Sequence, residues 1–400
     1  MNKFNKTKNT VYLDHASSAN FASSNPSAIH ALGVQEKNKL ENVRKKVADI
    51  LHAHSDEVVF TSGATESNNL AILGLVSDFN KPHIVTTNIE HASVLELCKH
   101  LEETKRATVT YVEVGNDGIV DPKKIKKAIK ENTVLVSVMY ANNEIGTIQP
   151  IQEIAKEIRH YNKRNRKMKF LEWSSDFFRG PEKNLHFPVS FHTDATQAVN
   201  YLSINVAKLG VDLMSFNGAK IYGPKGVGVL YVKKNTPIKK IMFGGDQEHG
   251  LRPGTENVSG ITELAFALEH TEKIKEREVA RLSKLREYFI NKLSNISHAH
   301  EINGDLVNRL PNNINITFPN IPSDLLVIEL SAHGIMSSAK SACKSGDGKA
   351  SHVIQAINKN IKDTDGSLRF SLGRDTAKHD IDYTITVLKN VLQKLEKWYN

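Results

Sequence analysis

Cysteine is scarce in this chain, and long apolar runs are missing. Only two of the 400 residues are cysteine, too few for a disulfide framework, so we expect the reducing cytoplasm as its compartment. No apolar run approaches the ~20 residues that a membrane span needs. The first ten residues, MNKFNKTKNT, are polar, so we expect neither a signal peptide nor an anchor.

Metal-binding motifs are also missing, although the chain has 17 histidines. There is no Cys-x-x-Cys and no His-Glu-x-x-His, and the close pairs His52/His54 and His298/His300 lack partners at ligand spacing. We therefore expect no bound metal.

The net charge of +9 comes mostly from scattered lysines, with dense clusters at 123–127 and 163–169. Such clusters could contact nucleic acid or an acidic protein. The first is mixed with Ile125, Ala128 and Ile129 at helical spacing, which predicts a solvated helix face. The second is less regular and is the better candidate for a contact surface. Direct binding of nucleic acid is not expected.

Strands and helices alternate in the first half of the chain. The expected strands are 57–60, 83–87, 108–114 and 133–139, and the expected helices include 28–53, 68–75, 94–101 and 151–160. This order predicts a doubly wound α/β layer with its functional loops at the carboxyl ends of the strands. The turn 61–67, TSGATES, stands between a strand and a helix and is a candidate phosphate cup, although many such turns bind nothing.

The stretch 192–232 contains the most informative pair of residues. Three apolar runs, ending near 194, 216 and 232, predict three strands with Asp194 and Lys220 at their ends. A lysine so near buried strands is unusual, because an ammonium is unfavourable to desolvate without a partner. Conversion to an imine with an aldehyde cofactor would remove that charge, and an acid would hold the pyridine nitrogen. The pair indicates a pyridoxal phosphate enzyme, whereas either residue alone is more often a surface lysine or a strand-end aspartate.

The two cysteines stand in different settings. Cys98 lies on a predicted helix, where a small buried apolar residue is the default. Cys343 lies in SSAKSACKSGDGKASH, which has no apolar periodicity and predicts an exposed loop. Lys340 and Lys344 would favour its thiolate, so Cys343 is a candidate nucleophile, with a bystander cysteine as the alternative.

The chain is too long for one compact core. The order of predicted elements changes beyond 260, where helices at 261–297, 324–333 and 380–399 accompany strands at 312–318 and 367–372. We predict a large domain at 19–262 and a smaller α+β domain made of 1–18 and 263–400. Residues 161–191 break the alternation and are predicted to be an insertion.

In its ordered motifs the chain resembles the pyridoxal-phosphate-dependent cysteine desulfurases, class V aminotransferase-like enzymes, of the class with a long cysteine loop. The motifs are FTSGATESNNLAI (60–72), TTNIEHASV (86–94), ANNEIGTIQPI (141–151), HTDATQA (192–198), KIYGPKGVG (220–228), GGDQEHGLRPGTEN (244–257), SACKSG (341–346) and SLRFSLGR (367–374). The resemblance implies PLP fold type I, an α/β fold with a mixed, mostly parallel seven-stranded sheet between helices.

On the cofactor side, the resemblance implies that Lys220 forms the imine with pyridoxal 5'-phosphate and that Asp194 pairs with the ring nitrogen. His91 would stack on the ring and assist proton transfers. The other cofactor contacts would come from Ala64, Thr65, Asn143, Gln197 and Asn217, and from Thr255 of the neighbouring subunit of a homodimer.

On the substrate side, it implies that Arg369 clamps the carboxylate of L-cysteine, with Asn143 nearby. Cys343 would take the sulfur as a persulfide, leave L-alanine, and deliver the sulfur to an iron–sulfur scaffold or to tRNA thiolation. A selenocysteine lyase, another class V enzyme, and a weakly active or inactive homologue with a binding role remain open alternatives.

The chain departs from the family pattern beside the lysine. Where the family usually has Ser-x-His-Lys, this chain has Asn217-Gly218-Ala219-Lys220. Asn217 can still donate through its amide, but Ala219 cannot donate to a phosphate, which predicts weaker cofactor retention. Lys340 also stands where a glycine is usual.

Overall fold

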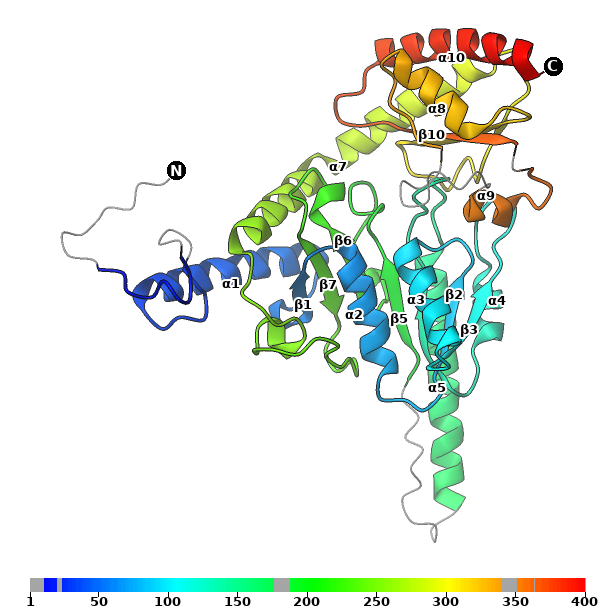
Figure 1. The fold of residues 1–400 in the computed structure, drawn as a ribbon. Coiled ribbons are helices and arrows are strands. Elements are labelled where there is room, and N and C mark those ends of the chain that lie inside the picture. The colour runs from blue at the N-terminus through cyan, green and yellow to red at the C-terminus, as the bar shows by residue number, and fades with distance from the viewer. Residues whose placement is uncertain (1–10, 20–23, 176–187, 340–350, 363, 400) are drawn as a thin grey trace.

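The computed structural model describes residues 11–19, 24–175, 188–339, 351–362 and 364–399. A seven-stranded sheet flanked by helices forms the larger part of the molecule, and a three-stranded sheet forms a smaller part (Figure 1). The long helix α7 (Val258–Leu293) runs from one part to the other.

The larger sheet has the strand order β1-β7-β6-β5-β4-β2-β3. All neighbours are parallel except that β7 runs antiparallel to β1 and β6. The strands are β1 (Val58–Thr61), β2 (His83–Thr87), β3 (Thr108–Val112), β4 (Thr133–Ser137), β5 (Ser190–Asp194), β6 (Leu213–Asn217) and β7 (Gly228–Val232). The predicted α/β fold with a mostly parallel seven-stranded sheet is therefore confirmed.

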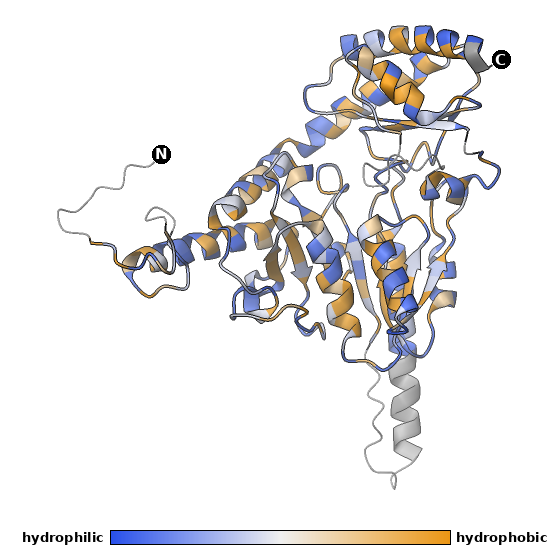
Figure 2. Ribbon diagram, in the orientation of Figure 1, coloured by the Kyte–Doolittle hydropathy of each residue, from blue (hydrophilic) through white to orange (hydrophobic). Residues whose placement is uncertain are grey.

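Helices cover both faces of this sheet because successive strand residues point to opposite sides. Val59 and Leu135 pack on the side of α2 (Ala64–Val76) and α3 (Ala92–Glu103). Val58 and Val136 pack on the other side, with α1 (Ala31–Leu51), α4 (Pro122–Ala128), α5 (Ile151–Ser175) and α7. Figure 2 shows apolar residues gathered on the strands and along the second half of α2, whose first half is polar.

The smaller sheet is antiparallel and has the order β10-β9-β8. Its strands are β8 (Glu301–Ile302), β9 (Asn313–Phe318) and β10 (Gly366–Ser371). They share a core with the second half of α7, α8 (Ser323–Ala332) and α10 (Lys378–Tyr399). The sequence pattern missed β8, which has only two residues and no periodicity to detect.

The predicted domain boundaries stay a prediction. The described part of the N-terminal segment, 11–19, lies beside α1, where Asp14 pairs with His30 at 3.2 Å. The predicted insertion at 161–191 begins as a continuation of α5 to Ser175 and ends in the first residues of β5. The segment 161–175 contains no glycine or proline to stop the helix. Residues 176–187, and the side chains from 165, lie outside the described residues.

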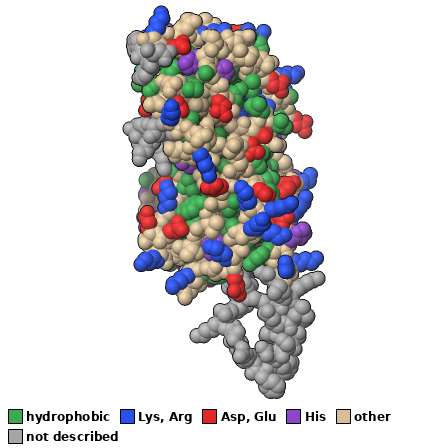
Figure 3. All heavy atoms as spheres, turned by 90° about the vertical axis from the view of Figure 1, so that its right-hand side faces the viewer, with side chains coloured by type: hydrophobic (Ala, Val, Ile, Leu, Met, Phe, Trp, Pro, Cys, Tyr) green, Lys and Arg blue, Asp and Glu red, His purple; other side chains and the backbone are tan. Residues whose placement is uncertain are grey.

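The first lysine cluster forms a solvated helix face, as predicted. On α4, Ile125 is buried whereas Lys123, Lys124 and Lys127 are exposed, and Lys126 pairs with Glu157 of α5. On the face shown in Figure 3, Lys and Arg side chains are interspersed with Asp and Glu. None of the described helices is long and apolar enough to cross a membrane.

Candidate active site

The carboxyl ends of the parallel strands meet at a cavity of about 470 Å³, within the size range of ligand sites. Nine of the eleven residues predicted for the site line it: Ala64, Thr65, His91, Asn143, Asp194, Gln197, Asn217, Lys220 and Arg369. They come from segments far apart in the chain. This edge of the sheet is where an open α/β fold places its ligands.

Lys220 lies in a short 3-10 turn, Gly218–Lys220, that follows β6. The Oδ1 atom of Asn217 accepts the Lys220 N–H at 3.2 Å, which caps the turn and leaves the Asn217 amide group to donate elsewhere. The expectation of a buried lysine is wrong, since Lys220 is exposed to the cavity. The turn leaves the sheet before the lysine is reached, so its ammonium does not need to be desolvated. Ala219 also lines the cavity and offers no donor.

Asp194 ends β5 and is almost fully buried. Its Oδ1 accepts the Thr196 N–H at 2.9 Å, and its Oδ2 accepts the Asn68 side-chain amide at 2.8 Å. These two donors hold the carboxylate in a fixed orientation at the cavity wall. An acidic side chain, which a protonated pyridine nitrogen requires as its partner, is therefore in place there.

His91 is the N-cap of α3, and its Nδ1 accepts the Ser93 N–H at 3.1 Å. The preceding residue, Glu90, is buried beneath the cavity. Its carboxylate accepts hydrogen bonds from the Thr87 hydroxyl and the Met139 N–H. Burial raises the pKa of Glu90 to about 8, with the Asp194 charge adding to the effect. Glu90 thus holds a proton through much of the neutral range.

The phosphate-cup candidate is the start of α2, where Ala64 and Thr65 line the cavity. The first N–H groups of a helix lack intrahelical acceptors, and the helix dipole favours an anion there. Glu66 follows Thr65 but is engaged in other contacts. Its carboxylate accepts the Ser62 N–H and pairs with Arg252 at 3.0 Å, which together lower its pKa against the opposing effect of burial.

Arg369 reaches the cavity from β10 of the smaller sheet. Its Nη1 donates to the Asn143 carbonyl at 3.1 Å, while its buried Nε has no partner among the described residues. Burial lowers its pKa, which Glu144 partly opposes. A planar cation with a free donor beside the cavity is suited to a carboxylate.

Two predicted residues are not placed in this cavity. Thr255 is exposed and is not among the described residues that line it. Cys343 and its neighbours Lys340 and Lys344 lie outside the described residues. The other cysteine, Cys98, is free and buried, and burial raises its pKa to about 12, which confirms it as a core residue.

Several cavity residues were missed from the sequence, among them Thr196, Asn200, Tyr201, Tyr222 and Asn312. Thr196 and Asn200 follow the predicted Asp194 and Gln197 closely, so their spacing could have indicated them. Asn312 precedes a strand of the smaller sheet, and no local pattern connects it to this site.

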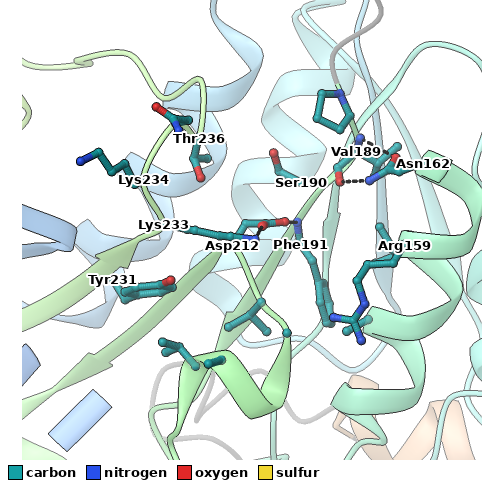
Figure 4. Close-up of a pocket in the computed structure, with 18 of the residues that line it drawn as sticks. Arg159, Asn162, Val189, Ser190, Phe191, Asp212, Tyr231, Lys233, Lys234 and Thr236 are labelled. Atoms are coloured by element: carbon teal, nitrogen blue, oxygen red, sulfur yellow. Dashed lines mark hydrogen bonds and ion pairs between the residues drawn. The ribbon is translucent and has the colours of Figure 1, made fainter. Parts of the chain in front are cut away.

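A second cavity, of about 850 Å³, lies at the opposite end of the larger sheet (Figure 4). The starts of β5 and β6 and the end of β7 line it, together with α5. Asp212 accepts the Phe191 N–H at 3.0 Å and pairs with Lys233 at 3.1 Å. Asn162 exchanges two hydrogen bonds with the backbone of Val189. Around neither cavity do three His, Cys, Asp or Glu side chains of the described ranges gather as a metal site would require.

The residues at the 470 Å³ cavity fit pyridoxal phosphate. An exposed lysine amine, a buried carboxylate with its donors in place, and a helix N-terminus stand on one wall. These are the groups needed for the aldehyde, the ring nitrogen and the phosphate of that cofactor.

Comparison with known proteins agrees with this geometry. The model of the family Aminotransferase class-V matches residues 7–164 and 184–384, leaving out part of the predicted insertion. The cysteine desulfurase IscS of Dictyoglomus turgidum is 40% identical, over 97% of this chain and 96% of its own. That of Methanosarcina thermophila is 41% identical, over 93% of this chain and 85% of its own.

Among solved structures, a NifS-like protein superposes with a TM-score of 0.80 at 33% identity, covering 92% of each chain. A NifS-like protein from Rickettsia africae has a TM-score of 0.76 at 28% identity, again covering 92% of each chain. The chain therefore belongs to the class-V aminotransferase family, among its pyridoxal-phosphate-dependent cysteine desulfurases.

Proposed function

We propose that this enzyme removes the sulfur of L-cysteine, holds it as a persulfide on Cys343 and releases L-alanine. The observation that carries the proposal is where the cysteine segment is attached. Residues 340–350 lie outside the described residues, but both flanks are bonded at the cavity. Ser338 exchanges two backbone hydrogen bonds with Arg369, and the Ser351 hydroxyl donates to Glu144, next to Asn143.

Cys343 follows Ser338 by five positions in the chain. An extended chain covers about 3.6 Å per residue, so five steps along the chain from Ser338 can span at most about 18 Å. Since Arg369 lines the cavity, the covalent tether supports access of Cys343 to a substrate bound there. The same tether permits it to face outward for delivery of the sulfur.

Arg369 and Asn143 would hold the substrate. The carboxylate of L-cysteine would take the free Nε and Nη donors of Arg369, whose position the Asn143 carbonyl sets. A guanidinium binds a carboxylate by two parallel hydrogen bonds, so the amino acid would be oriented as well as retained.

Asp194, Lys220 and His91 would carry the proton transfers. Bound pyridoxal phosphate supplies a protonated ring that accepts the electrons of a carbon–hydrogen bond. Asp194 would keep the ring nitrogen protonated, and Lys220 would move the proton at the substrate α-carbon. The Cys343 thiolate would attack the substrate sulfur. The carbon–sulfur bond then breaks with its electrons passing to the substrate, which takes up a proton to become alanine.

A second copy of the chain would complete the site. Thr255 is exposed, and large apolar side chains near its loop and on the N-terminal side are exposed as well, including Phe243 at 80% and Ile29 at 97%. A second copy of the chain that covered these side chains would remove apolar surface from water. We propose a homodimer in which Thr255 contacts the phosphate bound by the other subunit.

A protein that assembles iron–sulfur clusters or thiolates tRNA would accept the sulfur. With two cysteines in the chain and Cys98 free, the proposed compartment is the reducing cytoplasm.

The test is to measure alanine and sulfide from L-cysteine, with dithiothreitol present, for the wild type and for Cys343→Ala. We expect alanine formation to fall at least ~100-fold in Cys343→Ala, because the other cysteine of the chain, Cys98, is buried. Cys98→Ala is the matched control and should keep its activity. Alanine formation at the wild-type rate in Cys343→Ala would refute the persulfide step. A strong preference for selenocysteine over cysteine would favour a selenocysteine lyase.

A further inference from the structure

A buried asparagine, Asn68, connects two of the proposed catalytic residues. It stands on α2 one turn after the phosphate-cup candidate and is fully buried. Its side-chain NH₂ donates to Asp194 Oδ2 at 2.8 Å and contacts Ser93 Oγ at 2.8 Å. Its carbonyl Oδ1 has no partner among the described residues. Both donors of the amide are therefore in use while its acceptor is not.

The orientation of this amide follows from its neighbours. An ionised carboxylate can only accept, so rotating the amide by half a turn would place Oδ1 against Asp194 Oδ2. That rotation would also leave the NH₂ group without acceptors in a buried place. Asn68 therefore donates to Asp194 and, through its other hydrogen, to Ser93 Oγ.

The direction of the Asn68–Ser93 hydrogen bond also determines the direction of the hydrogen bond between Ser93 and His91. With Oγ accepting from Asn68, the Ser93 hydroxyl hydrogen is free to point at His91 Nδ1, 2.8 Å away. The same Nδ1 accepts the backbone N–H of Ser93 at 3.1 Å, and a backbone N–H cannot reverse its role. Nδ1 is thus an acceptor whose single lone pair is shared by the backbone N–H and the hydroxyl of Ser93, and the proton of a neutral His91 lies on Nε2.

We propose that Asn68 is a positioning residue, which orients the Asp194 carboxylate for the ring nitrogen of the cofactor and, through Ser93, directs a second donor to His91 Nδ1 that reinforces the Nε2–H form. His91 then presents a proton donor, not a base, at its free ring nitrogen. This inference deepens the proposed function and rests on it for the identity of the cofactor. It concerns residues whose geometry exists before any ligand binds.

The first test uses pyridoxal phosphate binding to the apoprotein. Asn68→Leu keeps the side-chain size but removes both donors, so we expect the dissociation constant to rise about tenfold or more, as for loss of one charge-assisted hydrogen bond. Asn69→Ala is the matched control. Asn69 is the next residue on α2, and within the described part of the chain its amide bonds only the Thr65 and Ser93 carbonyls, so binding should change less than twofold.

The second test is ¹⁵N NMR of histidine-labelled apoprotein at pH 7.5, with the His91 signals assigned by their loss in His91→Gln. In the wild type, Nδ1 should be unprotonated and Nε2 protonated. Ser93→Ala should shift the His91 Nδ1 signal and leave the cofactor dissociation constant within about threefold, whereas Asn68→Leu should shift the same signal and also raise the dissociation constant. This difference between the two variants is expected only if Asn68 acts on His91 through Ser93 and on the cofactor through Asp194.

Three outcomes would overturn the proposal: a wild-type His91 protonated on Nδ1, an unchanged Nδ1 signal in Ser93→Ala, or unchanged cofactor affinity in a folded Asn68→Leu. If Asn68→Leu does not fold, the wild-type and Ser93→Ala spectra decide. None of these readouts requires L-cysteine. A failure of the desulfurase assay and a failure of this inference can therefore be told apart.

Discussion

The two ends of the larger sheet carry cavities of opposite character. The one at the strand starts is the larger, at about 850 Å³, and two of its polar side chains, Asp212 and Asn162, are bonded to the backbone at the start of β5 (Figure 4). The one at the carboxyl ends measures about 470 Å³, and Lys220 and Arg369 present donors to it that no described residue uses fully. The smaller cavity is distinguished by the set of groups that it brings together, Lys220, Asp194 and Arg369, and not by its volume.

Chain direction explains the contrast. Strands β1 and β2 lead directly into the N-termini of α2 and α3, which bring free N–H groups to the carboxyl edge. The opposite edge receives no such helix starts from these strands. There Asp212 holds the start of β5 in place by accepting the Phe191 N–H.

The largest expected effect distinguishes the two lysines at these edges. Lys220→Ala removes the amine proposed to hold the cofactor, so alanine formation should fall at least ~1000-fold. Lys233→Ala, at the opposite edge, loses only an exposed ion pair with Asp212 and should stay within about twofold of the wild type. Steady-state rates from L-cysteine check both. Equal losses in the two variants would remove the functional distinction between the edges.

The next comparison is between Arg369 at the smaller cavity and Arg159 at the larger one. Arg369→Lys keeps the charge but loses the two-pronged contact, so KM for L-cysteine should rise about 10–100-fold with a smaller change in kcat. Arg159→Lys, at the other cavity, should leave both parameters unaltered. Michaelis curves for the two variants provide the check. An unchanged KM in Arg369→Lys would mean that the substrate carboxylate lies elsewhere.

Buried titratable groups at the two edges of the sheet should also make opposite contributions to the pH dependence of stability. Glu90 lies beneath the active edge with its pKa raised to about 8, above an ordinary value near 4.3. The folded state therefore keeps a proton that the unfolded chain has lost, and stability falls as pH rises from about 4.3 through 8. Between pH 6 and 8 this contributes a loss of about 2 kcal/mol, which Glu90→Gln should abolish.

His83, at the start of β2, acts in the other direction. Burial lowers its pKa to about 4, so the stability it contributes is lost as pH falls from about 6.5. Denaturant unfolding of wild type and Glu90→Gln at pH 6, 7 and 8 measures the Glu90 effect. Parallel pH dependences for the two proteins would show that Glu90 is already ionised in the folded state.

The smallest expected effect concerns the cofactor. Ala219→His restores a phosphate donor beside Lys220, and pyridoxal phosphate should then bind about tenfold more tightly. Titration of the apoprotein, followed by absorbance, measures this. A dissociation constant that does not decrease would show that Asn217 or another group already compensates.

Much of the fold was predictable because its signals are local. Buried apolar runs indicated β4, β5, β6 and β7, and glycine-containing turns separated them. The helix α5 was predicted too short, because its charged second half has no apolar stripe to follow. The strand β8 was too short to leave a pattern at all.

The sequence by itself determined the residue types of the site and their order, from the start of α2 through His91, Asp194 and Lys220 to Arg369, because each belongs to a motif recognisable within a few residues. Only the tertiary structure decided that Lys220 is exposed, since a turn at the sheet edge sets its exposure. The tertiary structure also decided that Asn68 meets Asp194 across 126 positions of sequence. Such a contact depends on how β5 and α2 are placed together, and no local pattern encodes that distance.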